Sequence, residues 1–201
     1  TNMLDADLAI IASIDFDHME YLGHTREAIA EEKAGIFRKD QWAICGDPAP
    51  PNTLEQTGQK LGTRMVYLGK DFEYKVNNAT WTFCSQISTV TYSNLRHSIL
   101  AVNNAAVVLQ AVLLLNTLLP VDVAKAIETI TTTKLPGRCE IRKRSDGGIV
   151  ILDVAHNPHS VSQLVKFLKP YASRKIVALF SMLKDKDIES TIAEMKQRVD
   201  E

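Results

Sequence analysis

Runs of strand length alternate with segments of helical character in the last third of the chain. Strands are expected at 149–154 and 175–180, and each is followed by an expected helix, at 158–168 and 188–199. Strands that alternate with helices in this way are typical of a parallel sheet covered by helices. The sequence therefore predicts an α/β fold with a parallel sheet in this part of the chain.

The first two thirds of the chain also mix strands and helices. The apolar run 6–14 ends in polar residues, as a central strand of a parallel sheet does at its carboxyl end. Further strands are expected at 42–45, 64–68, 72–76 and 80–84, and helices at 25–34, 53–61, 99–118 and 121–130. The strands 72–76 and 80–84 alternate well enough to form a hairpin.

Pro136 and Gly137 interrupt these patterns and mark a boundary between two domains. We expect one domain over 1–136 and another over 137–201. The basic run 138–144 beside this boundary is interpreted as a solvated connector.

Charge and composition exclude several classes of function. Lys and Arg (23) nearly balance Asp and Glu (24), so no nucleic-acid partner is implied. The longest apolar stretch, 99–119, is interrupted by four amide residues, and no secretory signal precedes it, so no membrane partner is expected. Three widely spaced cysteines fit reduced thiols and a cytoplasmic protein.

Both ends of the chain look interrupted. The first residue is Thr, almost nothing precedes the strand at 6–14, and no strand follows the helix at 188–199. We expect these 201 residues to be a piece of a longer protein.

Polar side chains directly follow the first strand. Asp15, Asp17 and His18 would lie at the carboxyl edge of the sheet, where open α/β sheets bind ligands. Spacing alone leaves two interpretations open, a catalytic or metal site and a simple polar loop.

Lys33 shares a helix face with Ile29, four residues earlier, and with Ala30. A lysine on a buried face usually extends its charge to water. If it cannot, desolvation leaves a neutral amine that could take up carbon dioxide and become a carbamate, an oxygen ligand suited to Mg²⁺.

A polar turn links the strand at 149–152 to the next helix. Asn157 suits the N-cap of that helix and Pro158 its first turn. Such a turn could hold phosphate or ribose, or it could be ordinary helix capping. Capping does not explain Asp153 and His156.

No segment fits the Walker A pattern of nucleotide-binding loops. The Gly69–Lys70 pair is followed by Asp71, where that pattern requires Ser or Thr. Taken alone, these residues indicate a soluble α/β protein with a ligand-binding edge.

Several stretches of the chain form a recognisable set: Thr1-Asn2 with the strand after it, Asp17-His18 through Tyr21-Leu22-Gly23 to Glu32-Lys33-Ala34-Gly35-Ile36, Leu135-Pro136-Gly137-Arg138, Asp153-Val154-Ala155-His156-Asn157-Pro158 and Met182-Leu183-Lys184-Asp185-Lys186-Asp187. In their order and approximate spacing they resemble the folylpolyglutamate/dihydrofolate synthase family of the Mur ligase superfamily.

The resemblance implies a particular fold. Residues 1–136 would form the later part of a P-loop ATPase-type central domain, and residues 137–201 the first half of a Rossmann-like C-terminal domain. The phosphate-binding loop and a metal-binding glutamate would precede Thr1, and further strands would follow Glu201.

The resemblance also assigns roles to residues. His18 matches a Mg²⁺-binding histidine, and Lys33 matches a carbamylated lysine that serves both metal binding and catalysis. Arg138 and Asp153 match nucleotide contacts, and His156 lies near the reaction centre. Asn104 resembles an adenine contact, although the glycine and histidine that often precede it are absent here.

The implied activity is an ATP-dependent amide ligation with ATP and Mg²⁺ as cofactors. ATP would phosphorylate a carboxylate of dihydropteroate or of a folate, and the amine of L-glutamate would displace phosphate. The full-length protein is expected to be a monomer, and this piece to be inactive alone. Two alternatives stay open, a non-catalytic remnant or binding module of the same fold and another Mur-type ligase. The choice between dihydrofolate synthase and polyglutamate synthase also stays open.

Overall fold

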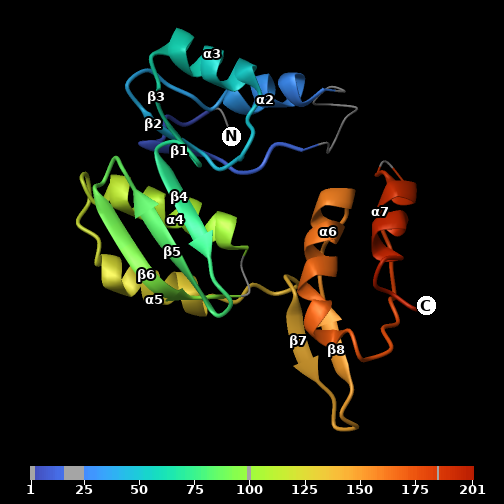
Figure 1. Cartoon of the computed structure of the whole chain (residues 1–201). Coiled ribbons are helices and arrows are strands. Elements are labelled where there is room, and N and C mark those ends of the chain that lie inside the picture. Colours follow the sequence, from blue (N-terminus) through green and yellow to red (C-terminus); the bar gives the residue numbers. More distant parts are fainter. Residues whose placement is uncertain (1–2, 16–24, 99–100, 185) are drawn as a thin grey trace. The chain divides into compact units, whose positions relative to one another are not determined.

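The computed structural model describes residues 3–15, 25–98, 101–184 and 186–201. It divides the chain into two compact units, Thr1–Lys134 and Leu135–Glu201 (Figure 1). Helices and sheets occur in both units, so the predicted α/β class is confirmed. Within the described residues no helix is long and apolar enough to cross a membrane.

A parallel sheet of three strands forms the base of the first unit. Its order is β1 (Leu8–Ile11), β2 (Trp42–Cys45) and β3 (Arg64–Tyr67). The register pairs Leu8 with Trp42 and Trp42 with Arg64. Among the described strands β2 is therefore central and β1 lies at the edge, whereas the sequence predicted a central first strand. β1 also has four residues rather than nine, and Ile10 is exposed.

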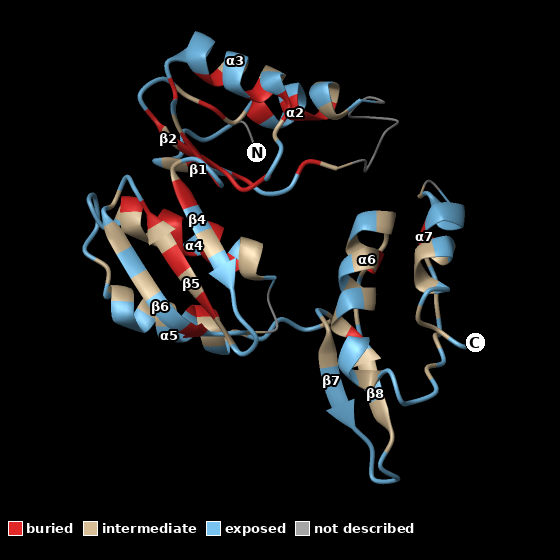
Figure 2. Ribbon diagram, viewed as in Figure 1, coloured by how far each residue is buried: buried red, intermediate tan, exposed pale blue. Residues whose placement is uncertain are grey.

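Side chains of β2 alternate between two hydrophobic clusters. Ala43 and Cys45 pack with two helices, α2 (Arg26–Ala34) and α3 (Asn52–Leu61), whose buried residues include Ile29 and Leu54. Ile44 faces the other cluster. Because side chains alternate along a strand, β2 is buried on both faces, as a near-continuous apolar run predicts (Figure 2).

An antiparallel sheet and two helices complete the first unit. The strands are β4 (Phe72–Val76), β5 (Thr80–Ser85) and β6 (Val90–Arg96), and the helices are α4 (Val102–Leu115) and α5 (Val123–Thr132). Residues of this sheet and of the two helices pack into one hydrophobic cluster, in which Trp81, Phe83 and Leu109 are almost fully buried. The predicted hairpin is confirmed, but the sequence missed β6. The pairing of β6 with β5 shifts register between Trp81 and Phe83 of β5, and Asn94 of β6 has φ 58°.

The second unit contains a two-stranded sheet and two helices. These elements are β7 (Glu140–Lys143), β8 (Ile149–Leu152), α6 (Pro158–Phe167), a 3₁₀ turn η1 (Lys169–Tyr171) and α7 (Ile188–Met195). α6 packs against α7. Val161, Leu168 and Thr191 are buried in this unit.

The parallel sheet predicted for the second unit is wrong for the described residues. β8 pairs with β7, antiparallel, through a tight turn at which Gly147 has φ 82°. This local hairpin occupies the basic run that was interpreted as a connector. Residues 175–180 form no strand; Ile176 and Ala178 instead hydrogen-bond with residues 200 and 201.

Candidate functional site

The carboxyl ends of β1 and β2 are joined by backbone contacts. The N–H of Gly46 donates to the carbonyl of Ile11 at 2.8 Å, and its own carbonyl accepts from Nδ2 of Asn103 at 3.0 Å. A Cβ atom added at Gly46 would lie 2.5 Å from Cγ2 of Val107. Helix α4 therefore packs directly against this edge, at a distance that only glycine permits.

A buried carboxylate organises the same edge. Oδ2 of Asp47 accepts from the backbone N–H of Ile14 at 2.6 Å and from Nη2 of Arg26 at 2.9 Å. Oδ1 accepts from the N–H of Ala49 at 2.9 Å. Sequence reasoning missed Asp47 and Arg26, although Asp47 follows a buried strand in the same way as the polar residues after β1 do.

The predicted metal ligands are not assembled by the described residues. His18 and Asp17 lie outside the described residues, and Asp15 is half-buried. Among the described residues no group of three or more His, Cys, Asp or Glu side chains could hold a metal ion.

Lys33 is exposed, and the prediction that it lies on the buried face of its helix is wrong in this structure. The buried residues of α2 are Ile29, Ala30 and Ala34. Lys33 lies beside this stripe, in the last turn of a helix of only nine residues, where a long side chain reaches water easily. Burial therefore does not favour a neutral amine at Lys33, and the carbamate is implied by the resemblance alone.

Two neighbouring asparagines at the start of α4 have different environments. The side-chain amide of Asn103 donates a hydrogen bond to the carbonyl of Gly46, whereas Asn104 is exposed. Asn104 is therefore the one of the two whose side chain is open to a ligand.

In the second unit the side chain of Asp153 links the two ends of the β7–β8 hairpin by a hydrogen bond, which we call the hairpin tie. Its Oδ2 accepts from the N–H of Cys139 at 2.7 Å, and its Oδ1 accepts from the N–H of Ala155 at 2.8 Å. Arg138 directly precedes Cys139 and its side chain is exposed. The structure thus binds Asp153 to the residue next to Arg138, although Arg138 and Asp153 are 15 residues apart in the sequence. Burial, followed by the charge of Asp153, raises the pKa of the Cys139 thiol to about 12.

The turn after β8 ends in a capped helix, as predicted. Asn157 accepts from the N–H of Ser160 at 2.8 Å and its own N–H donates to Oγ of Ser160 at 3.2 Å. Pro158 is the first residue of α6. Nδ1 of His156 lies 2.9 Å from the carbonyl oxygen of Val154. Helix capping therefore explains Asn157 and Pro158, and the hairpin tie gives Asp153 a structural role as well.

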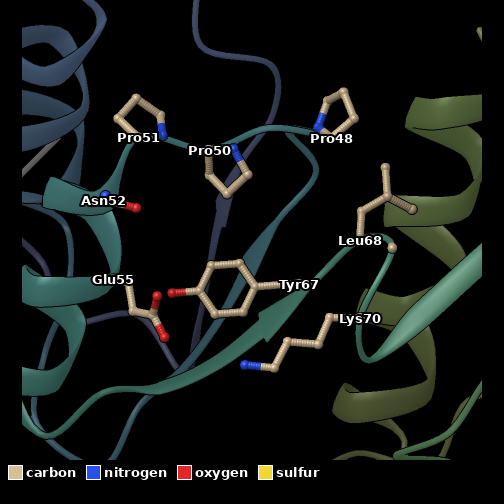
Figure 3. Close-up of a pocket in the computed structure, with 9 residues that line it drawn as sticks. Pro48, Pro50, Pro51, Asn52, Glu55, Tyr67, Leu68 and Lys70 are labelled. Carbon is tan, nitrogen blue, oxygen red and sulfur yellow. The ribbon is translucent and has the colours of Figure 1, made fainter.

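A hollow of about 300 Å³ lies between the start of α3 and the end of β3. Its walls include Pro50, Pro51 and Tyr67, with Glu55 and Lys70 at its margins (Figure 3). The buried hydroxyl of Tyr67 points towards Glu55 and has no hydrogen-bond partner. Sequence reasoning did not predict this hollow.

Residues 137–201 match the family described as the Mur ligase, glutamate ligase domain. The hairpin tie at Asp153, the capped turn before α6 and the exposed Arg138 all lie within this match. The second unit is therefore a domain of the Mur ligase class.

Relatives match the chain over its whole length. A dihydrofolate synthase/folylpolyglutamate synthase of Escherichia coli is 38% identical over 100% of this chain and 46% of its own length. The structure of E. coli FolC in complex with DHPP and ADP is similar with a TM-score of 0.89 and 38% identity, over 99% of this chain and 47% of that chain. A bifunctional folylpolyglutamate synthase/dihydrofolate synthase with Mn, AMPPNP and L-glutamate bound has a TM-score of 0.86 and 34% identity, over 100% of this chain and 47% of that chain.

The chain belongs to the folylpolyglutamate/dihydrofolate synthase family of Mur ligases, as the resemblance predicted. It spans about half the length of the curated relatives it matches.

Proposed function

We propose that the protein carrying this chain is an ATP-dependent ligase that joins L-glutamate to dihydropteroate, to folates or to both. The observation that carries the proposal is the similarity, over the whole of this chain and in both sequence and fold, to one relative in complex with DHPP and ADP and to another with Mn, AMPPNP and L-glutamate bound. The proposed reaction proceeds through an acyl phosphate on the carboxylate of the pterin substrate.

The hairpin tie supports a role for Arg138 and Asp153 in holding nucleotide. The bond from Cys139 to Asp153 fixes the backbone beside Arg138, so that the guanidinium starts from a defined position on the surface. A guanidinium held there would offset negative charge on phosphate oxygens. His156, three residues after Asp153 and next to the α6 N-terminus, is assigned to the reaction centre. Asn104, exposed at the start of α4, is assigned to the adenine.

The proposed metal ligands are His18 and Lys33. A bound Mg²⁺ would offset charge on the transferring phosphoryl group. His18 and a carbamylated Lys33 would hold the ion.

The 201 residues contain no Walker A loop. We therefore propose that phosphate binding is supplied by a part of the protein outside these residues and that this chain alone does not ligate glutamate. The complete protein is proposed to act as a cytoplasmic monomer on small-molecule substrates, without nucleic acid or membrane.

The proposal is tested by ADP release from the complete protein. We expect release only when L-glutamate is present together with dihydropteroate or a folate, and no release with muramyl substrates. Arg138→Ala should lower kcat about tenfold or more, because a charged contact to phosphate is lost. Arg142→Ala is the matched control, since Arg142 is exposed on β7 and pairs with Glu140. Ligation with muramyl substrates alone would overturn the assignment.

A further inference from the structure

We propose that Asp47 and Arg26 are positioning residues for the proposed ligase reaction, and that they fix the base of the segment linking β1 to α2. The inference rests on the proposed function, because that segment and α2 carry the residues assigned to the metal. It assigns no direct contact with substrate to either side chain.

Asp47 is placed to hold this edge from within. Its side chain is 4% exposed, and its carboxylate accepts three hydrogen bonds, from the N–H groups of Ile14 and Ala49 and from Arg26. Burying a carboxylate costs free energy unless its oxygens accept hydrogen bonds, and both oxygens of Asp47 do so. Asp47 is thus bound to the chain after β1, to the chain after β2 and to the start of α2.

Arg26 closes the same arrangement from the side of the helix. Nε donates to the carbonyl of Ile14 at 3.0 Å, and Nη2 donates both to Asp47 and to the carbonyl of Ala49 at 3.1 Å. The planar fork of a guanidinium can serve three acceptors in fixed directions, which a lysine cannot do. Arg26 is also the first residue of α2, whose N-cap is Thr25.

The two contacts together pin both ends of one segment. Ile14 has its N–H bound by Asp47 and its carbonyl bound by Arg26, so residues 14 and 26 are held side by side. The sequence between them contains Asp17 and His18, and α2 continues to Lys33. Displacing residue 14 relative to residue 26 would therefore displace the chain after β1 relative to α2, the helix that carries Lys33.

The arrangement is anchored to the core of the unit. Asp47 follows Gly46, which is bound to Ile11 and Asn103 and packs against Val107 of α4. The position of the carboxylate is thus set by α4 and by the sheet rather than by the loop itself. Three hydrogen bonds converge on the Asp47 carboxylate and fix its direction, so the side chain can set the position of the groups that it binds.

The test uses the complete protein with Asp47→Asn, which keeps the shape of the side chain but removes its charge. We expect kcat for ligation to fall about tenfold or more, with KM for ATP changed by less than about threefold, because misplacing a catalytic group slows chemistry more than it weakens binding. Amide hydrogen exchange in peptides covering residues 14–26 should become faster, measured without nucleotide or metal. Arg26→Lys should lower kcat and speed up exchange in the same way, because a lysine keeps the positive charge but lacks the planar guanidinium that donates to Ile14, Asp47 and Ala49.

Asp5→Asn is the matched control. Asp5 pairs with Arg38 in the same unit, and its side chain is 82% exposed. We expect no change in kcat or in exchange of residues 14–26. If Asp47→Asn does not fold, Arg26→Gln provides the same test, because the Arg26 side chain is 34% exposed and is less buried than that of Asp47.

The outcomes separate the two proposals. A wild-type protein without ligase activity would refute the proposed function, while the exchange comparison would still report on the pinned segment. An active wild type combined with unchanged kcat and unchanged exchange in Asp47→Asn or Arg26→Gln would refute the positioning role alone. A rise in KM for ATP with unchanged kcat would also refute it.

Discussion

The carboxylate of Asp153 accepts a hydrogen bond at 2.7 Å from the backbone N–H of Cys139, 14 residues earlier. The bond joins the end of β8 to the residue before β7. Cys139 has φ 46°, a left-handed conformation that is unfavourable for a residue with a Cβ atom. The contact with Asp153 therefore holds a strained residue in place beside Arg138.

Removing this carboxylate should destabilise the second unit. Asp153→Ala leaves the N–H of Cys139 without its acceptor, and we expect the free energy of unfolding to fall by about 1–3 kcal/mol. Asp153→Asn keeps one carbonyl oxygen as an acceptor, so its free energy of unfolding should fall by less. Urea denaturation of both variants measures the difference, and equal losses would contradict the account.

Gly137 is expected to resist substitution for two separate reasons. It has φ 67°, and a Cβ atom placed there would lie 3.0 Å from Cγ1 of Val154. Gly137→Ala should cost about 1–2 kcal/mol for the backbone conformation and more for the contact. Gly147→Ala is the control, because Gly147 has φ 82° but nothing within 4 Å of a Cβ atom. Thermal denaturation should show a larger loss for Gly137→Ala; a larger loss at Gly147 would exclude the steric argument.

Gln110 should be a site of stabilising substitution. It is fully buried in α4, and both polar atoms of its amide lack hydrogen-bond partners among the residues that the structure describes. Replacing the amide by an apolar group of similar size removes this cost, so Gln110→Met should raise the free energy of unfolding by about 1–2 kcal/mol. Gln59→Met, at an exposed position of α3, should change it by less than about 0.5 kcal/mol. A destabilised Gln110→Met would mean that the amide has a role in folding.

Cys45 should make stability fall at alkaline pH. Burial, more than the nearby charge of Asp47, raises the pKa of its thiol to about 11 from an ordinary value of 9.0. Its folded-state pKa is above the unfolded value, so the contribution to stability is complete below about pH 9 and is lost as pH rises through about 11. The free energy of unfolding should decline over this range, and Cys45→Ala should remove part of the decline. An identical pH dependence in the variant would contradict the assignment to Cys45.

Local signals predicted several elements of both units. The bounds of β2 and β4 are as expected, Thr25 caps α2, and Asn157 and Pro158 begin α6 as their chemistry requires. These features depend on short stretches of sequence, in which alternation and capping are decisive.

Features set by tertiary contacts were missed. β7 lies in a basic run with a single apolar residue, Ile141, and only its pairing with β8 defines it as a strand. The run 175–180 has the composition of a strand but has no partner strand among the described residues, and Leu179 is fully exposed. Lys33 shares a helical face with Ile29 by spacing, yet its side chain reaches solvent beside the contact of α2 with α3. Asp47 and Arg26 went unnoticed because their significance depends on contacts 21 residues apart.

The most direct test follows one oxygen atom through the reaction of the complete protein. Dihydropteroate carrying isotopically labelled oxygen in its carboxylate is incubated with ATP and L-glutamate, and the inorganic phosphate is analysed by mass spectrometry. An acyl phosphate places that oxygen between carbon and phosphorus, and attack by the amine expels it with phosphate. We predict labelled phosphate in step with amide formation. Amide formation with unlabelled phosphate would contradict the mechanism, and the absence of ATP-dependent amide formation would contradict the ligase assignment itself.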